Sequence, residues 1–438
     1  MRGLRTPVSD LRKSIFTEVA KIAYEADSAN LNDAVEAVPY TVCPGDVPTY
    51  RESIYRERAI AAERVRLAMG MSLRPQDKPV HVTSGLEESN VAEKYYEPPL
   101  MQVIPSACNL CEEKKYEVSN MCQGCIAHPC MEVCPKGAIS QVDGKSVIDQ
   151  EKCIKCGRCK AACPYDAISK KERPCSMACG IGAIGTDEYG RAKIDADKCV
   201  SCGQCMVSCP FGAIADKSQI FQLIRCMKEG GEVIAEIAPA FVGQFGPGAT
   251  PKHVKAALLE LGFSEVVEVA LGADIGAVAE AHHYANHVAT GELPFLLTSC
   301  CPAWVKYLET EHPEMLKHLS SCKSPMSMLS PVLVELVPRQ LNIDRDNLVV
   351  VAIMPCTAKK YECKRPELSK SGRPDTDYVL TTQELGRMIK EAGINFNAIE
   401  PEANDSPFGE YSGAGTIFGA SGGVAGAAAG TTYEFSTN

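Results

Sequence analysis

Sixteen cysteines between Cys108 and Cys209 divide into four sets of four, and four thiolates are what one cubane iron–sulfur cluster needs. Three runs place three closely spaced cysteines before a fourth that is followed by proline. A tight loop of this kind brings three thiolates to three corners of one cube. The segment is therefore predicted to carry electrons. The runs are Cys122, Cys125, Cys130 and Cys134, with two extra residues before the third cysteine; Cys153, Cys156, Cys159 and Cys163; and Cys199, Cys202, Cys205 and Cys209.

The order of these runs predicts one two-cluster module inserted into another. In two-cluster modules the fourth cysteine of each run ligates the cluster of the other run. The neighbouring runs at 122–134 and 153–163 can pair in this way, which leaves the run at 199–209 without a partner. The remaining four cysteines, two before and two after the inner pair, supply that partner. The predicted ligand sets are Cys122, Cys125, Cys130 and Cys163; Cys153, Cys156, Cys159 and Cys134; Cys108, Cys111, Cys175 and Cys209; and Cys199, Cys202, Cys205 and Cys179.

Zinc and disulfide bonds are the alternatives for so many cysteines. Zinc ribbons space their cysteine pairs further apart, and they need neither the proline nor the Gly-Ala-Ile that follows several of the fourth cysteines. Disulfide bonds need an oxidising compartment, and the N-terminus lacks the apolar stretch of a signal peptide. No segment has the length and hydrophobicity of a membrane span. We therefore expect a cytoplasmic protein in an anaerobic setting, because exposed clusters and free thiols oxidise readily.

Length and composition allow two or three domains with hydrophobic cores, since 45% of the 438 residues are hydrophobic. The formal net charge of −10 argues against a nucleic-acid binder. Residues 1–100 are predicted to form a helical N-terminal region and linker, with amphipathic helices over 9–26 and 50–71. A packing or docking role is expected for them.

After residue 220, apolar runs of strand length alternate with helical patterns, which is typical of βαβ units and a parallel sheet. Two cysteine loops directly follow predicted strands: the loop at 298–304 follows a strand at 295–297, and Pro355-Cys356 follows a strand at 347–354. Ligands of such sheets gather beyond the carboxyl ends of the strands. The sequence therefore predicts a reaction centre at these two loops.

The loops Thr298-Ser-Cys-Cys-Pro-Ala-Trp304 and Met354-Pro-Cys-Thr-Ala-Lys-Lys-Tyr-Glu362 resemble the first two signature motifs of the iron-only ([FeFe]) hydrogenases. Agreement continues in Lys323-Ser-Pro325 and through the glycine-rich segments at 409–415 and 417–423. The inserted modules and the Ser-Cys-Lys-Ser-Pro at 321–325 look most like the divergent group B. The resemblance covers about residues 100–438. It implies an α/β catalytic domain over 221–438, built of two lobes with parallel sheets, preceded by α+β ferredoxin-like modules over 101–220 and the helical region.

The resemblance also implies cofactors and their ligands. Besides four [4Fe-4S] clusters, it implies an H-cluster, in which a [4Fe-4S] cubane is linked to a two-iron subsite that reduces protons or oxidises H2. By motif, Cys301 and Cys356 look like cubane ligands, and Cys300 looks like the thiol that passes protons to the subsite. Lys359 would pair with a cyanide ligand. The residues expected to line the two-iron pocket are Met354 and Pro239.

Two features depart from the family pattern. The third motif, which supplies two more cysteines near the C-terminus, does not occur before the last residue, so the catalytic domain is expected to be incomplete. Either the sequence is a fragment or a separate polypeptide completes the site. In the proton path, Glu280 and Ser320 match the family, whereas His283 takes the place of a second glutamate, with His287 one turn further on. Histidine relays protons near neutral pH, although a packed or surface histidine fits the spacing equally well.

These features predict a ferredoxin-linked hydrogenase. The expected partners are ferredoxin or another small redox protein, H2 and protons, and cluster maturation proteins, with no nucleic acid and no membrane. The alternative is a non-catalytic relative, which would be an electron-transfer or redox-sensing protein or an assembly factor. The assembly relatives depart from both cysteine loops, which are intact here. A cluster of basic residues in an otherwise acidic chain could steer an acidic partner to the inner module, although an ordinary solvated face fits the same residues equally well. They are Lys155, Arg158, Lys160, Lys170, Lys171 and Arg173.

Overall fold

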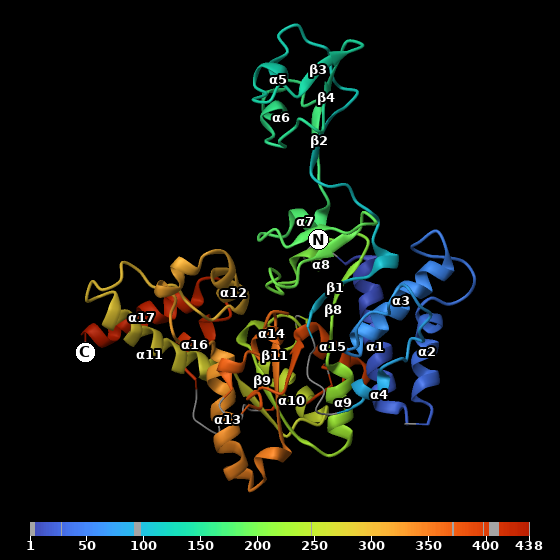
Figure 1. Ribbon diagram of the computed structural model, residues 1–438. Coiled ribbons are helices and arrows are strands. Elements are labelled where there is room, and N and C mark those ends of the chain that lie inside the picture. Colours follow the sequence, from blue (N-terminus) through green and yellow to red (C-terminus); the bar gives the residue numbers. More distant parts are fainter. Residues whose placement is uncertain are drawn as a thin grey trace.

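A four-stranded parallel sheet forms the centre of the C-terminal half in the computed structural model (Figure 1). The structure describes residues 5–27, 29–91, 98–246, 248–369, 372–396, 398–402 and 411–437. The strand order is β10–β9–β11–β12, and the two central strands are almost wholly buried, as in parallel sheets covered on both faces. The strands are β9 (Glu232–Ile237), β10 (Glu265–Glu268), β11 (Leu348–Met354) and β12 (Tyr378–Thr381).

Helices cover both faces of this sheet, because its strands are apolar on both sides. One face packs against α13 (Pro325–Leu341), and Ile234 of β9 belongs to the core between them. The opposite face, which includes Val233 of β9, packs against several helices in one large core. Those helices include α9 (Ile220–Lys228), α10 (Pro251–Glu260) and α15 (Thr382–Glu391).

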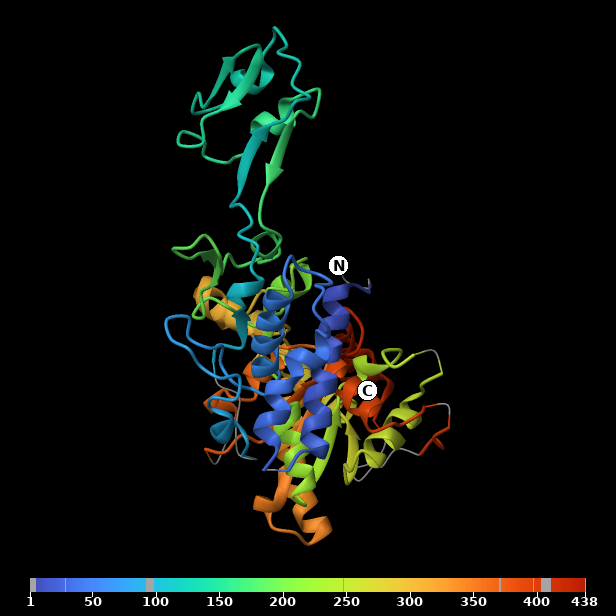
Figure 2. The same ribbon diagram turned by 90° about the vertical axis from the view of Figure 1, so that its right-hand side faces the viewer.

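The N-terminal helices belong to this same large core. Helix α1 begins with a capping box between Thr6 and Ser9, and it lies against α9 and α15 (Figure 2). Val19 of α1 is fully buried there. The predicted helical region is therefore a layer of the C-terminal half rather than a separate unit. Its helices are α1 (Pro7–Glu25), α2 (Leu31–Val42), α3 (Ile54–Ala68) and the short α4 (Leu86–Ser89).

The cysteine-rich segment folds as two modules, one inserted into the other. In the outer module β1 pairs with β8 and β6 with β7, all antiparallel. The inner module, residues 115–171, projects beyond it on the ribbon of β2 and β5 (Figures 1 and 2). The outer elements are β1 (Met101–Val103), α7 (Pro174–Met177), β6 (Ile184–Thr186), β7 (Ala192–Ile194), α8 (Gln204–Ser208) and β8 (Ile214–Asp216). The inner elements are β2 (Lys115–Val118), α5 (Pro129–Glu132), β3 (Ile139–Val142), β4 (Lys145–Ile148), α6 (Arg158–Ala162) and β5 (Ile168–Lys171).

The second lobe of the catalytic half is helical in the described residues, and the expected second parallel sheet is not formed there. The predicted strand at 295–297 contributes only one parallel bridge, between Leu297 and Leu319, because no further described strand lies beside it.

Gly415 packs tightly on α11, since a Cβ there would lie 2.3 Å from the Ala270 carbonyl oxygen. Gly409 and Glu410 of the same motif lie outside the described residues. The helices of this lobe are α11 (Ala270–His287), α12 (Pro302–Glu311), α16 (Gly413–Ile417) and α17 (Gly423–Thr437).

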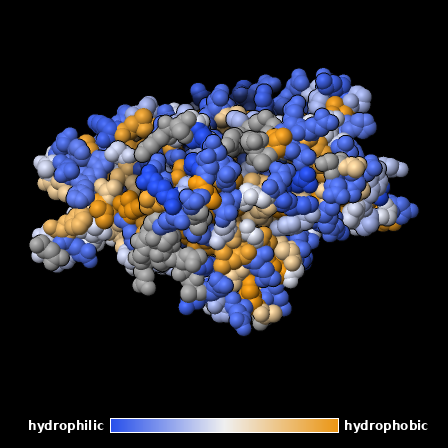
Figure 3. Space-filling view, turned by 90° about the horizontal axis from the view of Figure 1, so that it is seen from below, coloured by the Kyte–Doolittle hydropathy of each residue, from blue (hydrophilic) through white to orange (hydrophobic). Residues whose placement is uncertain are grey.

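The surface at the end opposite the inner module mixes hydrophilic residues with small groups of apolar ones (Figure 3). Among the described residues, no helix combines the length and hydrophobicity that crossing a membrane requires.

Candidate active site and cluster-binding cysteines

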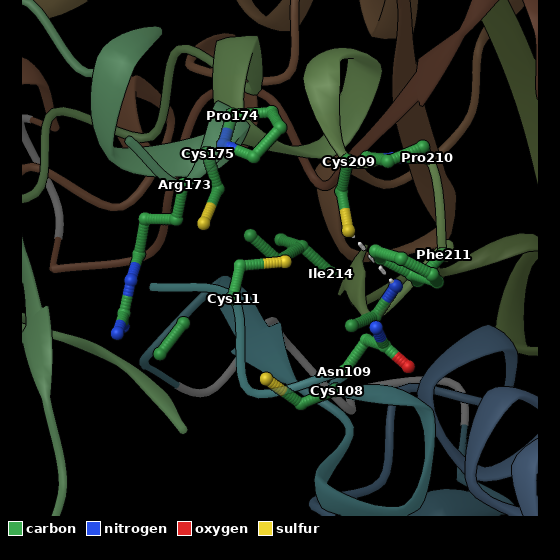
Figure 4. A pocket seen from close by; sticks show the side chains of 12 residues that line it. Cys108, Asn109, Cys111, Arg173, Pro174, Cys175, Cys209, Pro210, Phe211 and Ile214 are labelled. Carbon is green, nitrogen blue, oxygen red and sulfur yellow. Dashed lines mark hydrogen bonds between the residues drawn. The ribbon is translucent and has the colours of Figure 1, made fainter. Parts of the chain in front are cut away.

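Four cysteines from three separate parts of the chain line one cavity of the outer module (Figure 4). Cys108 and Cys111 lie in the loop after β1, Cys175 lies in α7, and Cys209 ends α8. Burial, and then the neighbouring charge of Cys209, raise the pKa of Cys175 to about 11. The backbone N–H of Ala213 donates to Cys209 Sγ at 3.4 Å. The structure thus brings together the four residues that the nested pairing places in one set.

The second outer set also comes together. Burial, and then the close charges of Cys199, Cys202 and Cys179, raise the pKa of Cys205 to about 12. Cys179 therefore lies near Cys199, Cys202 and Cys205, although it is not part of their run in the sequence. The backbone N–H of Ala183 donates to Cys179 Sγ at 3.3 Å, which is the kind of bond that stabilises a thiolate.

The inner module shows the same arrangement. Cys153, Cys156 and Cys159 line a second cavity together with Cys134, the fourth cysteine of the preceding run. Two cysteines of the other inner set, Cys122 and Cys130, contact Ser146. The Ser146 N–H donates to Cys122 Sγ at 3.5 Å, and Cys130 Sγ lies 3.5 Å from the Ser146 hydroxyl. Cys163 packs in the same small core, and Cys125 is half-buried in the loop between Cys122 and Cys130.

The two signature loops meet beyond the carboxyl ends of β9 and β11. Met354 is the buried last residue of β11, and Pro239 follows β9, so both expected pocket residues lie at adjacent strand ends. Cys356 follows in the same loop. Burial raises its pKa, and the charge of nearby Cys301 contributes to the rise. Cys301 is exposed and precedes α12. Burial also raises the pKa of Cys300.

Lys359 joins the two loops. Its Nζ donates to the Cys300 carbonyl oxygen at 3.1 Å and to Glu362 Oε2 at 2.5 Å. Glu362 is buried and accepts a further hydrogen bond from Ser327 of α13 at 3.1 Å. The short helix α14 (Lys359–Glu362) holds the lysine and its glutamate on one turn. Both lysine contacts fix a cationic head beside Cys300, the cysteine expected to pass protons.

The proposed proton path is assembled around Ser320. His283 Nδ1 lies 3.3 Å from the Ser320 hydroxyl, and Glu280 is buried on the preceding turn of α11. Burial raises the pKa of Glu280, which the Ser320 hydroxyl partly offsets. Burial, and then the neighbouring His287, lower the pKa of His283. The Cys322 N–H also donates to Ser320 Oγ, at 3.1 Å.

Glu236 in the middle of β9 is a buried carboxyl that the sequence analysis did not single out. It is fully buried, and burial raises its pKa to about 8. Ser330 donates to its Oε1 at 2.8 Å and Thr376 at 3.4 Å, while Oε2 has no hydrogen-bond partner among the described residues. A glutamate inside the apolar run at 232–237 is the signal that could have revealed it.

Three family models match the chain. The model described as iron only hydrogenase large subunit, C-terminal domain, matches residues 231–438. A 4Fe-4S dicluster domain matches 152–213, and the LdpA Fe-S cluster-binding domain matches 122–173. The second and third matches together span the inner module and the run at 199–209. The cysteine-rich segment is therefore an iron–sulfur region, which answers the zinc and disulfide alternatives.

Curated relatives agree with these models. The chain is 38% identical over 317 residues to iron hydrogenase 1 of Clostridium pasteurianum, covering 69% of this chain and 54% of that protein. It is 39% identical over 297 residues to the periplasmic [Fe] hydrogenase large subunit of Nitratidesulfovibrio vulgaris, covering 66% and 67%. It is 36% identical over 148 residues to the cytosolic Fe-S cluster assembly factor NAR1 of Debaryomyces hansenii, covering 33% and 27%. The chain thus spans about half the length of the first relative and two thirds of the second.

Proposed function

Because the chain belongs to the family of iron-only hydrogenase large subunits, we propose that it catalyses reversible H2 oxidation and proton reduction, with electrons exchanged with ferredoxin. Each of the four cysteine sets would hold one [4Fe-4S] cluster. Cys301 and Cys356 would ligate the cubane of an H-cluster, and Met354 and Pro239 would line its two-iron part. When bound, that cofactor supplies the redox-active iron at which protons and H2 interconvert.

The residues of the chain would bind this cofactor and move protons. Lys359 is oriented by Glu362 and the Cys300 carbonyl, so its remaining N–H can donate to an anionic ligand. Cys300 is a neutral thiol at neutral pH, because burial raises its pKa, and a neutral thiol can give a proton and take another. Glu280 and His283, with Ser320 beside them, lead from that thiol along α11.

The observation that carries the proposal is the junction of the two signature loops at Lys359. Its bond to the Cys300 carbonyl brings the expected proton carrier and the expected cubane ligands to one edge of the parallel sheet. Each loop alone could be structural, whereas their meeting at the strand ends suits a shared cofactor.

The direct test is H2 production by the fully loaded chain. The chain, completed with the two further cysteines that the resemblance expects, would be reconstituted anaerobically with iron and sulfide, given the two-iron subsite by maturation proteins, and supplied with reduced ferredoxin or with reduced methyl viologen. H2 production that depends on Cys300 supports the proposal. A loaded chain that neither produces nor consumes H2 contradicts it.

A second candidate is a non-catalytic role, because the assembly factor NAR1 of Debaryomyces hansenii matches a third of the chain. Transfer of an iron–sulfur cluster to an apoprotein, by a chain that shows no H2 chemistry, would favour this candidate. The intact Cys300-Cys301-Pro302 and Met354-Pro355-Cys356 sequences favour the hydrogenase. We further propose, from the inserted module and the motif at 321–325, that the chain is of group B and acts in the cytoplasm, where thiols stay reduced.

Electrons would enter at the inner module. Residues 115–171 carry nine Lys and Arg against six Asp and Glu, whereas the whole chain has a net charge of −10. Arg158 and Lys160 are exposed on α6, beside the cavity of Cys153, and Lys155 is half-buried there. An acidic redox protein would be steered to this surface.

The other three residues of the expected basic patch do not offer an exposed, unpaired charge to an acidic partner. Lys170 pairs with Glu172 and Lys171 with Glu117, so nearby carboxylates already offset both charges. Arg173 is buried and donates to the Gly185 carbonyl at 3.1 Å. This bond links the start of α7 to β6. The docking surface we propose is therefore smaller than the sequence predicted, and it centres on Lys155, Arg158 and Lys160.

A further inference from the structure

The loop that carries Cys199 and Cys202 is joined directly to the second signature loop. Thr357, the residue after Cys356, donates its hydroxyl to the Ser201 carbonyl oxygen at 2.7 Å. Gly203 makes this approach feasible: its φ is +73°, and a Cβ there would lie only 3.0 Å from Thr357 Oγ1. A side-chain hydrogen bond thus connects a loop of the outer module with the loop of an expected cubane ligand.

The same loop is also joined to the first signature loop. Lys306 lies on α12, which begins directly after Cys301. Its Nζ donates to the Cys199 carbonyl at 2.8 Å and to the Ala196 carbonyl at 3.3 Å. The ammonium group also lies 5.0 Å from the centre of the Tyr361 ring, which keeps it between the outer module and the catalytic half. Both signature loops therefore hold the outer loop, each through one side chain.

We infer that Lys306 and Thr357 form the junction at which electrons pass between the cluster of the Cys199 set and the cubane, and that Lys306 raises the reduction potential of that cluster. The inference rests on the proposed cluster ligands. In proton reduction, an electron supplied by ferredoxin would pass from the cluster held by the Cys199 set to the cubane, with no bond formed or broken and no proton transferred. A cation beside a cluster stabilises its reduced, more negative form, so it makes the cluster easier to reduce. Lys306 and Thr357 are thus positioning residues.

The potential is tested in the full chain, reconstituted anaerobically with iron and sulfide and titrated while reduced clusters are followed by electron paramagnetic resonance. In Lys306→Met, one component should titrate at lower potential, and that component should be the one missing from a Cys202→Ala chain. Lys306→Arg, which keeps the charge and the donors, should restore the potential. Lys317→Met, which removes an exposed lysine outside the junction, is the matched control. The inference on Lys306 is overturned if no component shifts, or if Lys317→Met shifts it equally.

The hand-over is tested with Thr357→Val, which removes only the hydroxyl, against Thr357→Ser, which keeps it. H2 production driven by ferredoxin should fall severalfold relative to production driven by methyl viologen in the valine variant, and the serine variant should retain the wild-type ratio. An unchanged ratio in Thr357→Val overturns the role of this bond. Absence of H2 production in the wild-type chain would instead count against the proposed function, and the potential of the Cys199 cluster would still test the inference on Lys306.

Discussion

Burial sets the protonation state of the residues in the candidate site. It raises the pKa of Cys300 and Cys356, and it does the same for Glu280. Burial keeps these groups neutral until they pass on a proton, because a charge in the interior is costly. The residue types of the proton path were predictable from the sequence by resemblance. That Ser320 is a partner of both His283 and Cys322 was not predictable, because only the fold creates these contacts.

The adjacent cysteines Cys300 and Cys301 should respond differently to substitution. Cys300→Ser should keep the iron content and lose most H2 turnover, because a hydroxyl at neutral pH neither donates nor regains a proton as easily as a thiol. Cys300→Asp should retain part of the activity, since a carboxyl group can still relay protons. Iron analysis and H2 production of the loaded chain measure both effects.

Cys301→Ser is the matched comparison for these variants. It removes an expected thiolate ligand, so the loaded chain should lose iron from the cubane. If Cys300→Ser loses iron while Cys301→Ser keeps it, the two assignments are reversed.

Glu236→Gln should stabilise the chain increasingly as the pH rises. The folded pKa of about 8 lies above the ordinary value of 4.5, so the folded state holds a proton that the unfolded state releases. Between these values the carboxyl group costs the folded state roughly 1.4 kcal/mol per pH unit at most, and an amide of the same shape avoids this cost. Urea unfolding of the apo chain at pH 5 and pH 8 measures how much Glu236→Gln raises the free energy of unfolding over that of the wild-type chain. Equal gains at both pH values would contradict the raised pKa.

At the scale of elements, sequence patterns located two N-terminal helices and a central strand of the parallel sheet. The predicted helices at 9–26 and 50–71 became α1 and α3, and the predicted strand at 347–354 became β11. The prediction was wrong at 295–297. A short apolar run predicts that a segment is extended, but whether it joins a sheet depends on a partner strand, which local patterning does not report.

Reversal of the exposed basic residues should slow electron entry from an acidic ferredoxin. With Lys155, Arg158 and Lys160 all changed to Glu, the rate with reduced ferredoxin should fall roughly tenfold or more at low salt, because steering of the encounter is lost. The difference should shrink at high salt, where exposed charges are screened. Stopped-flow measurement of cluster reduction at two salt concentrations gives both rates.

The control for this prediction is the double variant Lys170→Glu and Lys171→Glu. These lysines lie in the same module but already pair with Glu172 and Glu117. Their reversal should slow entry less than the triple variant does. Equal slowing by both variants, or rates that do not depend on salt, would remove the docking role from Lys155, Arg158 and Lys160.

At the scale of the whole molecule, the N-terminal helices join the iron–sulfur region to the catalytic half. Arg64 of α3 donates to the Gly212 carbonyl beside Cys209, and Leu67 packs against Ile104 of the outer module. Lys360, beside Lys359, forms buried ion pairs with Asp216 of β8 and Glu384 of α15. None of these long-range contacts has a sequence signature, because each joins segments that are far apart in the chain. The nesting of the modules was predictable, since cysteine spacing is itself a record of ligation.

That nesting makes a prediction about iron content. With four clusters outside the H-cluster, the reconstituted chain should hold about sixteen irons in the cysteine-rich segment, four per cluster. Cys179→Ala and Cys202→Ala should each remove one cluster, and because both residues belong to one set, the double variant should lose no more iron than either single one. Cys179→Ala combined with Cys156→Ala should lose about twice as much, since Cys156 serves an inner cluster. Non-additive loss marks a shared site and additive loss marks separate ones. If Cys179→Ala and Cys202→Ala prove additive while Cys179→Ala and Cys156→Ala do not, Cys179 serves the inner module and the nested pairing is wrong.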